Sequence, residues 1–404
     1  MSIIHVGITG IGHELGEIGV SNEEVSKIVE TALRDKNEHR TGNRNLSKEE
    51  EQNGLCDPRW LNKKKFYGRV HSERTPVGLG VPAARKAIDM AGCNVQDIQA
   101  VFFGTVHPDY NISPTCAQLA IRDLGIETKT NLGLKPLLPA QIHNTCTTIG
   151  TTITLAWATI KAGLAKRVLI IGADKMSDTT DPVDRSFYPI MGDAGTAIVM
   201  EAVTESRDSF PWQEKSFFST ADPSGVENII SLAGGAAMPL TADMILGDPD
   251  QPLWKPRPDK LWQDGPKVFD DVVKLLAHPD RAKFSQTVYG TALNQVGLEL
   301  ADIHAIYPHQ ASVRMNDLLL ENLKYLGFKG RMSDTGKKYG NTTSAAVLLG
   351  VSEDFEQDIL KTDQIIALNS FGAGYTVCII FVHWTLDLPC PMVEAHKPLH
   401  MPTH

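Results

Sequence analysis

The sequence is poor in cysteine and lacks a long apolar run. Its six cysteines are scattered over 404 residues, with no CxxC pair and no zinc-type spacing, so we predict neither a disulfide framework nor a metal site. The longest uncharged stretch, residues 136–160, is threonine-rich and contains Pro139 and Gly150, which argues against a membrane span. The first residues carry neither a cationic start nor a sustained apolar core. We therefore expect no signal peptide and a location in the reducing cytoplasm.

The charge pattern excludes further classes of protein. Lys and Arg number 39 against 48 Asp and Glu, which gives a net charge of −9 with both signs mixed along the chain. No DNA- or RNA-binding signature is present, so we expect no nucleic-acid partner. No glycine fingerprint of the Rossmann or P-loop type is evident, and we expect no cofactor. The composition, 42% hydrophobic and 22% charged, is typical of a globular chain with two or three domains' worth of core.

Residues 143–174 carry the most informative local pattern. Cys146 precedes a stretch, 149–160, in which apolar residues recur at three- and four-residue steps and so predict a helix. Gly163 is placed to end that helix, and residues 167–173 (RVLIIGA) predict a strand buried on both faces. Cys146 is thus expected at a helix start, where N–H groups and the helix dipole stabilise a thiolate. An inert core cysteine is the alternative, because free cysteines are often buried.

The flanking sequence alternates between predicted strands and helices. Strands are predicted at residues 3–9, 100–105 and 196–201, and helices at 23–34, 81–91 and 114–124. The first strand is expected to end in a turn at 10–16 (GIGHELG). A polar excursion at 43–78 is predicted to have little regular structure, and a Pro- and Gly-rich insertion at about 222–262 to lie near a site. Residues 63–65 and Arg69 form a basic cluster, interpreted as solvated surface, with docking of an acidic partner as the alternative.

The second half of the sequence repeats the first. Residues 91–102 (AGCNVQDIQAVF) and 296–307 (VGLELADIHAIY) share glycine, aspartate, isoleucine and alanine at a constant offset of 205. The order of Cys146, helix and strand recurs as Ser344, helix and the apolar segment 364–374. Two matches in the same order indicate a duplicated α/β unit. The predicted divisions are an N-terminal half, a C-terminal half and a C-terminal tail: 1–205, 206–385 and 386–404.

Three segments of the second half carry polar or glycine residues where core is expected. His309 follows a predicted strand, and ligands bind at that end of the strands in α/β sheets. Asn341 precedes a predicted helix, and residues 370–374 (SFGAG) form a glycine turn that a ligand can approach closely. A surface histidine, a helix cap and a simple hairpin are the alternatives. The predicted symmetry favours a site, because it brings the helix starts at Cys146 and Asn341 together.

As a set, these segments resemble the β-ketoacyl synthase III branch of the thiolase superfamily over about residues 1–385. The matching stretches, in the family's order, are RTG from Arg40, NTC ending at Cys146, VLIIGAD, MGDAG, PHQASVR, YGNTTSAA and SFGAGYT. The resemblance implies an α/β thiolase fold, with duplicated halves, mixed central sheets and five layers in the order α-β-α-β-α. It also implies a homodimer that takes acyl groups from acyl carrier protein or coenzyme A (CoA) thioesters.

The resemblance also assigns roles to single residues. Cys146 would be the acyl-accepting nucleophile, with His309 and Asn341 completing the catalytic group. The oxyanion hole would be formed by the backbone N–H groups of Cys146 and Ala373. The positions at which the resemblance indicates substrate binding are Arg40, Ile112, Ser312, Arg314, Gly372 and Gly374.

The chain departs from the family's pattern at three positions. Ala373 replaces the middle glycine of a triple, which leaves the backbone donor in place. Lys36 stands where the family has a tryptophan that stacks on the CoA adenine, and Ser312 replaces an asparagine. With the excursion and the insertion, these departures indicate a specialised relative, in lipid or polyketide biosynthesis, rather than the enzyme that initiates ordinary fatty-acid synthesis.

The implied reaction is an acyl transfer in two steps. Cys146 accepts an acyl group from a thioester, and a decarboxylative Claisen condensation with a malonyl- or β-ketoacyl-thioester follows. Ile112 replaces a large aromatic ring of the housekeeping enzymes, and residues 229–246 supply an apolar wall. Both features predict medium or long acyl chains.

Four alternative functions differ from this one in the residues they require. Acyl transfer to an oxygen or nitrogen acceptor stays open, because the pocket walls decide the acceptor. A cysteine hydrolase shares the order Cys, His, Asn, but the local protease signature is missing. A degradative thiolase would carry a second cysteine near Ser370, and a non-catalytic partner subunit would have lost Cys146.

Overall fold

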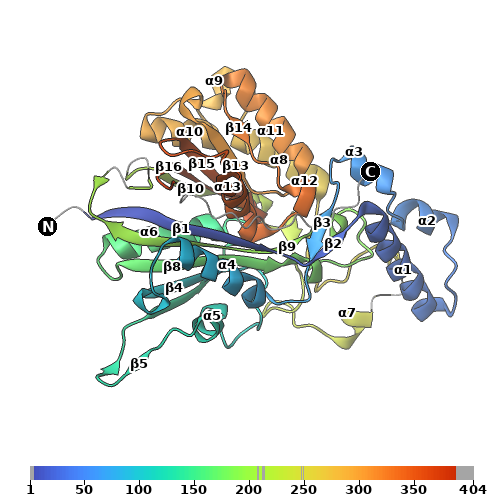
Figure 1. The fold of residues 1–404 in the computed structure, drawn as a ribbon. Helices are drawn as coiled ribbons and strands as arrows, with labels where there is room; N and C mark the ends of the chain where they lie inside the picture. The colour runs from blue at the N-terminus through green and yellow to red at the C-terminus, as the bar shows by residue number, and fades with distance from the viewer. Residues whose placement is uncertain (1–3, 207–208, 212–213, 247, 249, 388–404) are drawn as a thin grey trace.

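Two five-stranded mixed sheets form the centre of the computed structural model, which describes residues 4–206, 209–211, 214–246, 248 and 250–387 (Figure 1). The first sheet has the order β1 (His5–Leu15), β9 (Asp193–Val203), β8 (Arg167–Lys175), β4 (Ala100–Gly104) and β7 (Leu138–Ile142). The second has the order β10 (Phe217–Ala221), β16 (Thr376–His383), β15 (Ile365–Gly372), β13 (Ala305–Pro308) and β14 (Arg331–Met332).

The two sheets repeat one topology. In each, the first two pairings are antiparallel and the last two are parallel. The two segments offset by 205 residues fold alike: each passes a left-handed glycine, Gly92 or Gly297, and a short 3₁₀ turn before entering β4 or β13. The predicted duplicated α/β fold with mixed sheets is therefore confirmed.

Helices form three layers around the two sheets. Helices α6 (Thr148–Lys161) and α13 (Ala346–Glu356) lie between the sheets, where α6 contacts strands of both. The outer face of the first sheet packs on α4 (Pro76–Met90) and α5 (Cys116–Leu124). The outer face of the second packs on α8 (Gly265–Leu276), α10 (Val288–Val296) and α11 (Val313–Leu326). The layers thus follow the predicted order α-β-α-β-α.

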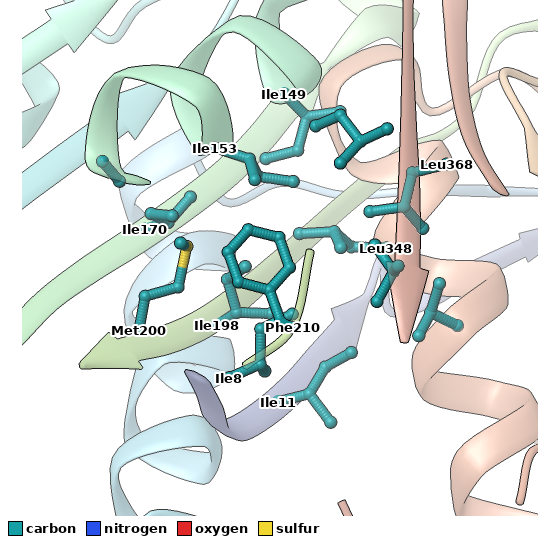
Figure 2. Packing of buried hydrophobic residues seen from close by; sticks show 14 of the residues in the cluster. Ile8, Ile11, Ile149, Ile153, Ile170, Ile198, Met200, Phe210, Leu348 and Leu368 are labelled. Carbon is teal, nitrogen blue, oxygen red and sulfur yellow. The ribbon is translucent and has the colours of Figure 1, made fainter. Parts of the chain in front are cut away.

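The core between the sheets explains why the central strands read as apolar on both faces. Ile149 and Ile153 of α6 pack on Ile170 of β8 and on Leu368 of β15 within one cluster (Figure 2). Leu169, the neighbour of Ile170 in β8, belongs instead to the cluster under α4 and α5. Alternate residues of a central strand therefore enter two different cores, as expected for a strand covered on both sides.

The N-terminal strand and helix both extend beyond their predicted bounds. β1 continues to Leu15, so the turn predicted at 10–16 is wrong. A Cβ atom at Gly10 or Gly12 would overlap the backbone of α4, which shows that these glycines allow a helix to approach the strand closely. Helix α1 (Asn22–Thr41) begins at Ser21, whose side chain forms a capping box with Glu24.

The excursion at 43–78 is regular, and the prediction of little regular structure is wrong. It contains α2 (Lys48–Gly54), α3 (Pro58–Lys63), β3 (Arg69–His71) and the start of α4. Ser47 and Asp57 cap the two short helices, which lack the length for an amphipathic period. Arg69 has no exposed surface, so it is not part of the predicted surface cluster.

The insertion at about 222–262 folds over the first half of the chain. Its ends pair as β11 (Ile229–Ile230) and β12 (Trp262–Gln263), and α7 (Ala242–Leu246) lies between them. Lys36 Nζ donates to the carbonyl oxygens of Leu253 and Lys255, at 2.9 and 2.8 Å. The remaining short elements are β2 (Ile18–Val20), β5 (Lys129–Thr130), β6 (Gly133–Leu134), α9 (Arg281–Phe284) and α12 (Gly336–Tyr339).

Most of the predicted tail, 386–404, falls outside the described residues, which end at Asp387. Among the residues that the structure describes, no helix combines the length and the apolar character needed to cross a membrane.

Candidate active site

One large cavity receives residues from both halves of the chain. Its volume is about 1450 Å³. Seven of the site residues predicted from the sequence line it: Cys146, His309, Ser312, Arg314, Asn341, Gly372 and Ala373. The loops that follow β7 and β13 and precede α6 and α13 therefore meet at one place, as the symmetry argument predicts.

Cys146 lies in a tight turn two residues before α6. Thr145 has φ +47, and the amide of Thr148, the first residue of α6, donates to the Thr145 carbonyl at 3.1 Å. Burial raises the pKa of the Cys146 thiol to about 11, and a hydrogen bond from the backbone N–H of Ala373 counteracts part of this rise. The resting group is therefore a thiol at neutral pH, placed beside backbone donors that favour negative charge.

The glycine turn after β15 determines how closely the backbone approaches Cys146. A Cβ atom at Gly372 would overlap both Cβ and Sγ of Cys146. Only glycine leaves room for the cysteine here, and this contact places the next amide, that of Ala373, beside the sulfur. Gly374 has φ +67 and shapes the same turn, although it is outside the described cavity lining.

His309 follows β13 directly and is fully buried. Neither ring nitrogen has a hydrogen-bond partner among the described residues, and the ring lies edge-on to Phe371 with 5.5 Å between centroids. Burial lowers the pKa of His309 to about 4, so the imidazole is neutral at pH 7. A buried imidazole with unused nitrogens is suited to bind a polar group that enters the cavity.

Asn341 is held by the first half of the chain. Its backbone N–H donates to the Ile190 carbonyl at 2.6 Å, and the Gly192 N–H donates to the Asn341 carbonyl at 3.1 Å. The side-chain Oδ1 accepts from the Thr343 amide at 3.0 Å. With Oδ1 occupied, the Nδ2 group is the one left to donate to a ligand.

A buried carboxylate that sequence reasoning missed joins the loops around the cavity. Asp174, at the end of β8, accepts hydrogen bonds from Thr105 Oγ1 at 2.8 Å, the Val106 amide at 2.7 Å and the Ser344 amide at 2.9 Å. Burial raises the pKa of its carboxyl group. The available signal was an acidic residue ending an otherwise apolar strand (VLIIGAD), because such a group needs several donors when buried.

The other candidate positions are divided between the cavity and its surroundings. Ser312 and Arg314 line the cavity. Arg40 lines a second pocket of about 830 Å³, and its Nη1 donates to the Gln251 carbonyl at 2.6 Å. Ile112 is 92% exposed, although its neighbour Asn111 lines the main cavity.

The excursion and the insertion both contribute walls to the main cavity. Lys64 and Phe66 come from the excursion and were not predicted as site residues. The insertion contributes Ile230 and Trp262, which are paired in the β11–β12 ladder and also line the second pocket. One two-stranded ladder thus borders both cavities. The described residues contain no group of three or more His, Cys, Asp or Glu side chains able to hold a metal ion.

Comparison with known proteins shows which family the chain is similar to. The model of 3-oxoacyl-[acyl-carrier-protein (ACP)] synthase III matches residues 140–215, and the model of its C-terminal part matches 293–384. The β-ketoacyl-[ACP] synthase III of Phocaeicola vulgatus is 28% identical over 387 residues, which is 96% of this chain and 99% of that protein. The synthase III of Sulfurovum sp. is 29% identical over 298 residues, 74% of this chain and 78% of that protein.

Solved structures give the same fold. A 3-oxoacyl-(ACP) synthase III structure has a TM-score of 0.76 at 21% identity, covering 94% of this chain and 100% of that chain. OleA from Xanthomonas campestris has a TM-score of 0.70 at 15% identity, covering 95% of this chain and 99% of that chain. Fold, cavity and matched sequences together define a thiolase-fold acyltransferase of the ketosynthase type. Within that class, the chain is similar to the β-ketoacyl-ACP synthase III-like condensing enzymes over residues 140–215 and 293–384.

The contact between Gly372 and Cys146 leads to a prediction. Gly372→Ala is expected to abolish acylation of Cys146, because the added methyl group displaces the sulfur from the Ala373 amide. The measurement is intact-protein mass after exposure to acyl thioesters, together with a thermal unfolding scan. Gly235→Ala is the control: it changes a cavity-wall glycine at which a Cβ atom meets nothing within 4 Å. Full acylation of Gly372→Ala would contradict the argument.

Proposed function

We propose that this chain catalyses a decarboxylative Claisen condensation through an acyl-Cys146 intermediate. The observation that carries this proposal is the convergence of a cysteine, a neutral histidine and an asparagine in one cavity beside a backbone N–H donor. Each group provides a different function that the chemistry needs. The cysteine is the nucleophile, and the histidine carries or donates a proton. The asparagine is a donor that does not titrate, and the backbone N–H stabilises the oxyanion.

The first half-reaction is transfer of the acyl group to sulfur. Cys146 Sγ attacks the thioester carbonyl, and the thiol proton is transferred toward the carrier sulfur, so His309 is not required as a base in this step. The backbone N–H groups of Cys146 and Ala373 stabilise the oxyanion, each worth about 3 kcal/mol. The C–S bond to the carrier then breaks, and the carrier thiolate takes up the proton. This step leaves His309 neutral and Cys146 acylated.

The second half-reaction forms the carbon–carbon bond. A β-carboxylated thioester loses carbon dioxide, and the electron pair of the broken bond becomes an enolate. His309 and Asn341 Nδ2 donate hydrogen bonds to the enolate oxygen. The enolate carbon attacks the acyl carbonyl and expels the Cys146 thiolate. Because its pKa is about 4, His309 serves as a neutral donor throughout the physiological range.

The cavity supports medium or long acyl substrates. Its volume of about 1450 Å³ exceeds what an acetyl group needs, and its walls include Ile229 and Leu240 of the insertion and Phe269 of α8. Each buried methylene contributes roughly 0.8 kcal/mol, so such walls favour longer chains. OleA of Xanthomonas campestris, a structural neighbour, is solved with bound lauric acid and lauroyl-CoA, which supports a role in specialised lipid or polyketide biosynthesis.

Two cations at the cavity support an anionic carrier. Within the described part of the chain, neither Lys64 nor Arg314 forms an ion pair with a carboxylate. The phosphates of CoA or of the pantetheine arm of an acyl carrier protein would compensate these charges. The proposed donors are therefore acyl-CoA or acyl-ACP thioesters.

A homodimer is supported by the open edge of the first sheet. β7 is the edge strand and pairs with β4 on one side, while Leu138 of β7 and Ile112 nearby are 43% and 92% exposed. Pairing of β7 with its copy across a twofold axis would cover this edge and place Ile112 at the partner's acyl pocket. Sedimentation is expected to show a dimer, and an active monomer would remove this part of the proposal.

The half-reactions are expected to separate in variants. Cys146→Ala should lose the acyl adduct, whereas His309→Ala and Asn341→Ala should keep it and lose condensation by about a hundredfold or more. Intact mass measures loading, and carbon dioxide release with product analysis measures condensation. Cys93→Ala is the matched control, because this half-buried cysteine lies outside the described cavity lining. Loading of Cys146→Ala, or acyl transfer to an oxygen or nitrogen acceptor without carbon dioxide release, would contradict the proposal.

Chain-length preference gives a further expected outcome. Acylation of Cys146 should become more efficient from two- to twelve-carbon thioesters, by about fourfold per methylene until the cavity is filled. Ile112→Phe should penalise the longer substrates selectively, because the ring shortens the proposed pocket. Leu164→Phe is the control, since Leu164 is 74% exposed and remote from the described cavity lining. A maximum at two carbons would refute the long-chain proposal.

A further inference from the structure

The strand β3, part of the excursion, lies directly against the loop that carries Asn341. β3 packs on α12, the short helix that precedes Asn341, and Figure 1 shows the two elements side by side. The Tyr67 amide donates to the Lys337 carbonyl of α12 at 2.9 Å. On its other edge, β3 pairs with β2 through Val20 and Arg69. The excursion is therefore bonded to the turn in front of Asn341 rather than only covering the cavity.

Arg69 of β3 is unusual because it is a fully buried cation without a carboxylate partner among the described residues. Its Nη2 donates to Asn22 Oδ1 of α1, and its Nε and Nη1 have no partner in the described chain. Asn22 in turn donates from Nδ2 to the Phe66 carbonyl at 2.7 Å. Burial lowers the pKa of Arg69 to about 10, so the group stays charged at neutral pH. Because the guanidinium of Arg69 is fully buried, solvation at the surface cannot account for its charge at this position.

The turn before Asn341 is confined between Arg69 and Ile190, two residues of the first half of the chain. Gly340 has φ +78, and a Cβ atom there would stand 2.7 Å from the Ile190 carbonyl oxygen and 3.2 Å from Arg69 Cβ. Next to it, Asn341 is bonded to Ile190 and Gly192. The turn is thus fixed by backbone hydrogen bonds, including one from the Gly340 amide to the Gly336 carbonyl, and the stem of Arg69 limits the space beside Gly340.

We infer that Arg69 is a positioning residue that acts through Asn341. Its guanidinium, anchored on Asn22, holds its own stem against Gly340, so that Asn341 Nδ2 is kept where the enolate oxygen forms. This inference rests on the proposed role of Asn341 and adds a residue that does not touch substrate. It also gives the excursion a function in the second half-reaction: the excursion supplies one wall of the catalytic turn.

The test compares the two half-reactions in Arg69→Met, which keeps an unbranched stem and removes the guanidinium. Condensation is expected to fall at least tenfold, with acyl loading of Cys146 within twofold of the unaltered enzyme, because only the Asn341 side of the cavity is disturbed. Arg69→Lys, which restores the charge, should recover part of the condensation rate. Lys65→Met is the matched control: it removes an exposed ion pair of the same segment, to Asp317, and should change neither half-reaction.

A double-mutant cycle distinguishes positioning from general destabilisation. In an Asn341→Ala background, Arg69→Met should add less than a twofold further loss, because the group it positions is gone. Equal losses in loading and condensation, or independent losses that multiply in the double variant, would overturn the inference while leaving the role of Asn341 intact. If Asn341→Ala itself leaves condensation unchanged, the proposed role of Asn341 fails, and the inference about Arg69 fails with it. If Arg69→Met does not fold, Arg69→Lys enters the same cycle with the same criteria.

Discussion

The structure depends on one shared helical layer. Helices α6 and α13 are buried between the two sheets, and each begins next to a residue of the cavity, Cys146 or Asn341. Because both faces of this layer are packed, the starts of the two helices cannot move apart without opening the central core. Asp174 reinforces the same point with polar contacts, since its carboxylate joins loops of both halves. The geometry of the cavity therefore follows from the way the two duplicated halves pack around this helical layer.

Burial also determines the charge state of the cavity. It raises the pKa of Cys146 and lowers that of His309, so both groups are neutral at rest. In the proposed reaction, a neutral pair receives an uncharged thioester without first expelling an ion, and charge then develops beside backbone N–H donors. The cations Lys64 and Arg314 line the same cavity but do not come from the central helical layer. Lys64 comes from the excursion at 43–78, and Arg314 comes from α11.

How far the sequence predicts this structure depends on the range of the interaction. The central strands, the start of α1 and the duplicated α/β unit follow from local periodicity, capping and internal repetition, whereas the order of the layers was implied by the resemblance to a known family. The prediction of a turn at the glycines of β1 was wrong, because these glycines allow α4 to approach the strand closely. That contact is about 75 residues away along the chain. The short helices of the excursion and the burial of Arg69 were missed for the same reason: they depend on docking against α1 and α12, which no local pattern reports.

The ladder of β11 and β12 borders both cavities, and this has a consequence for how substrate range can change. Ile230 and Trp262 line both the cavity of Cys146 and the pocket of Arg40. A substitution at either position therefore changes the walls of both cavities at once. Under the proposed function, the fit of a substrate at Cys146 and the occupancy of the outer pocket are coupled through these two paired positions.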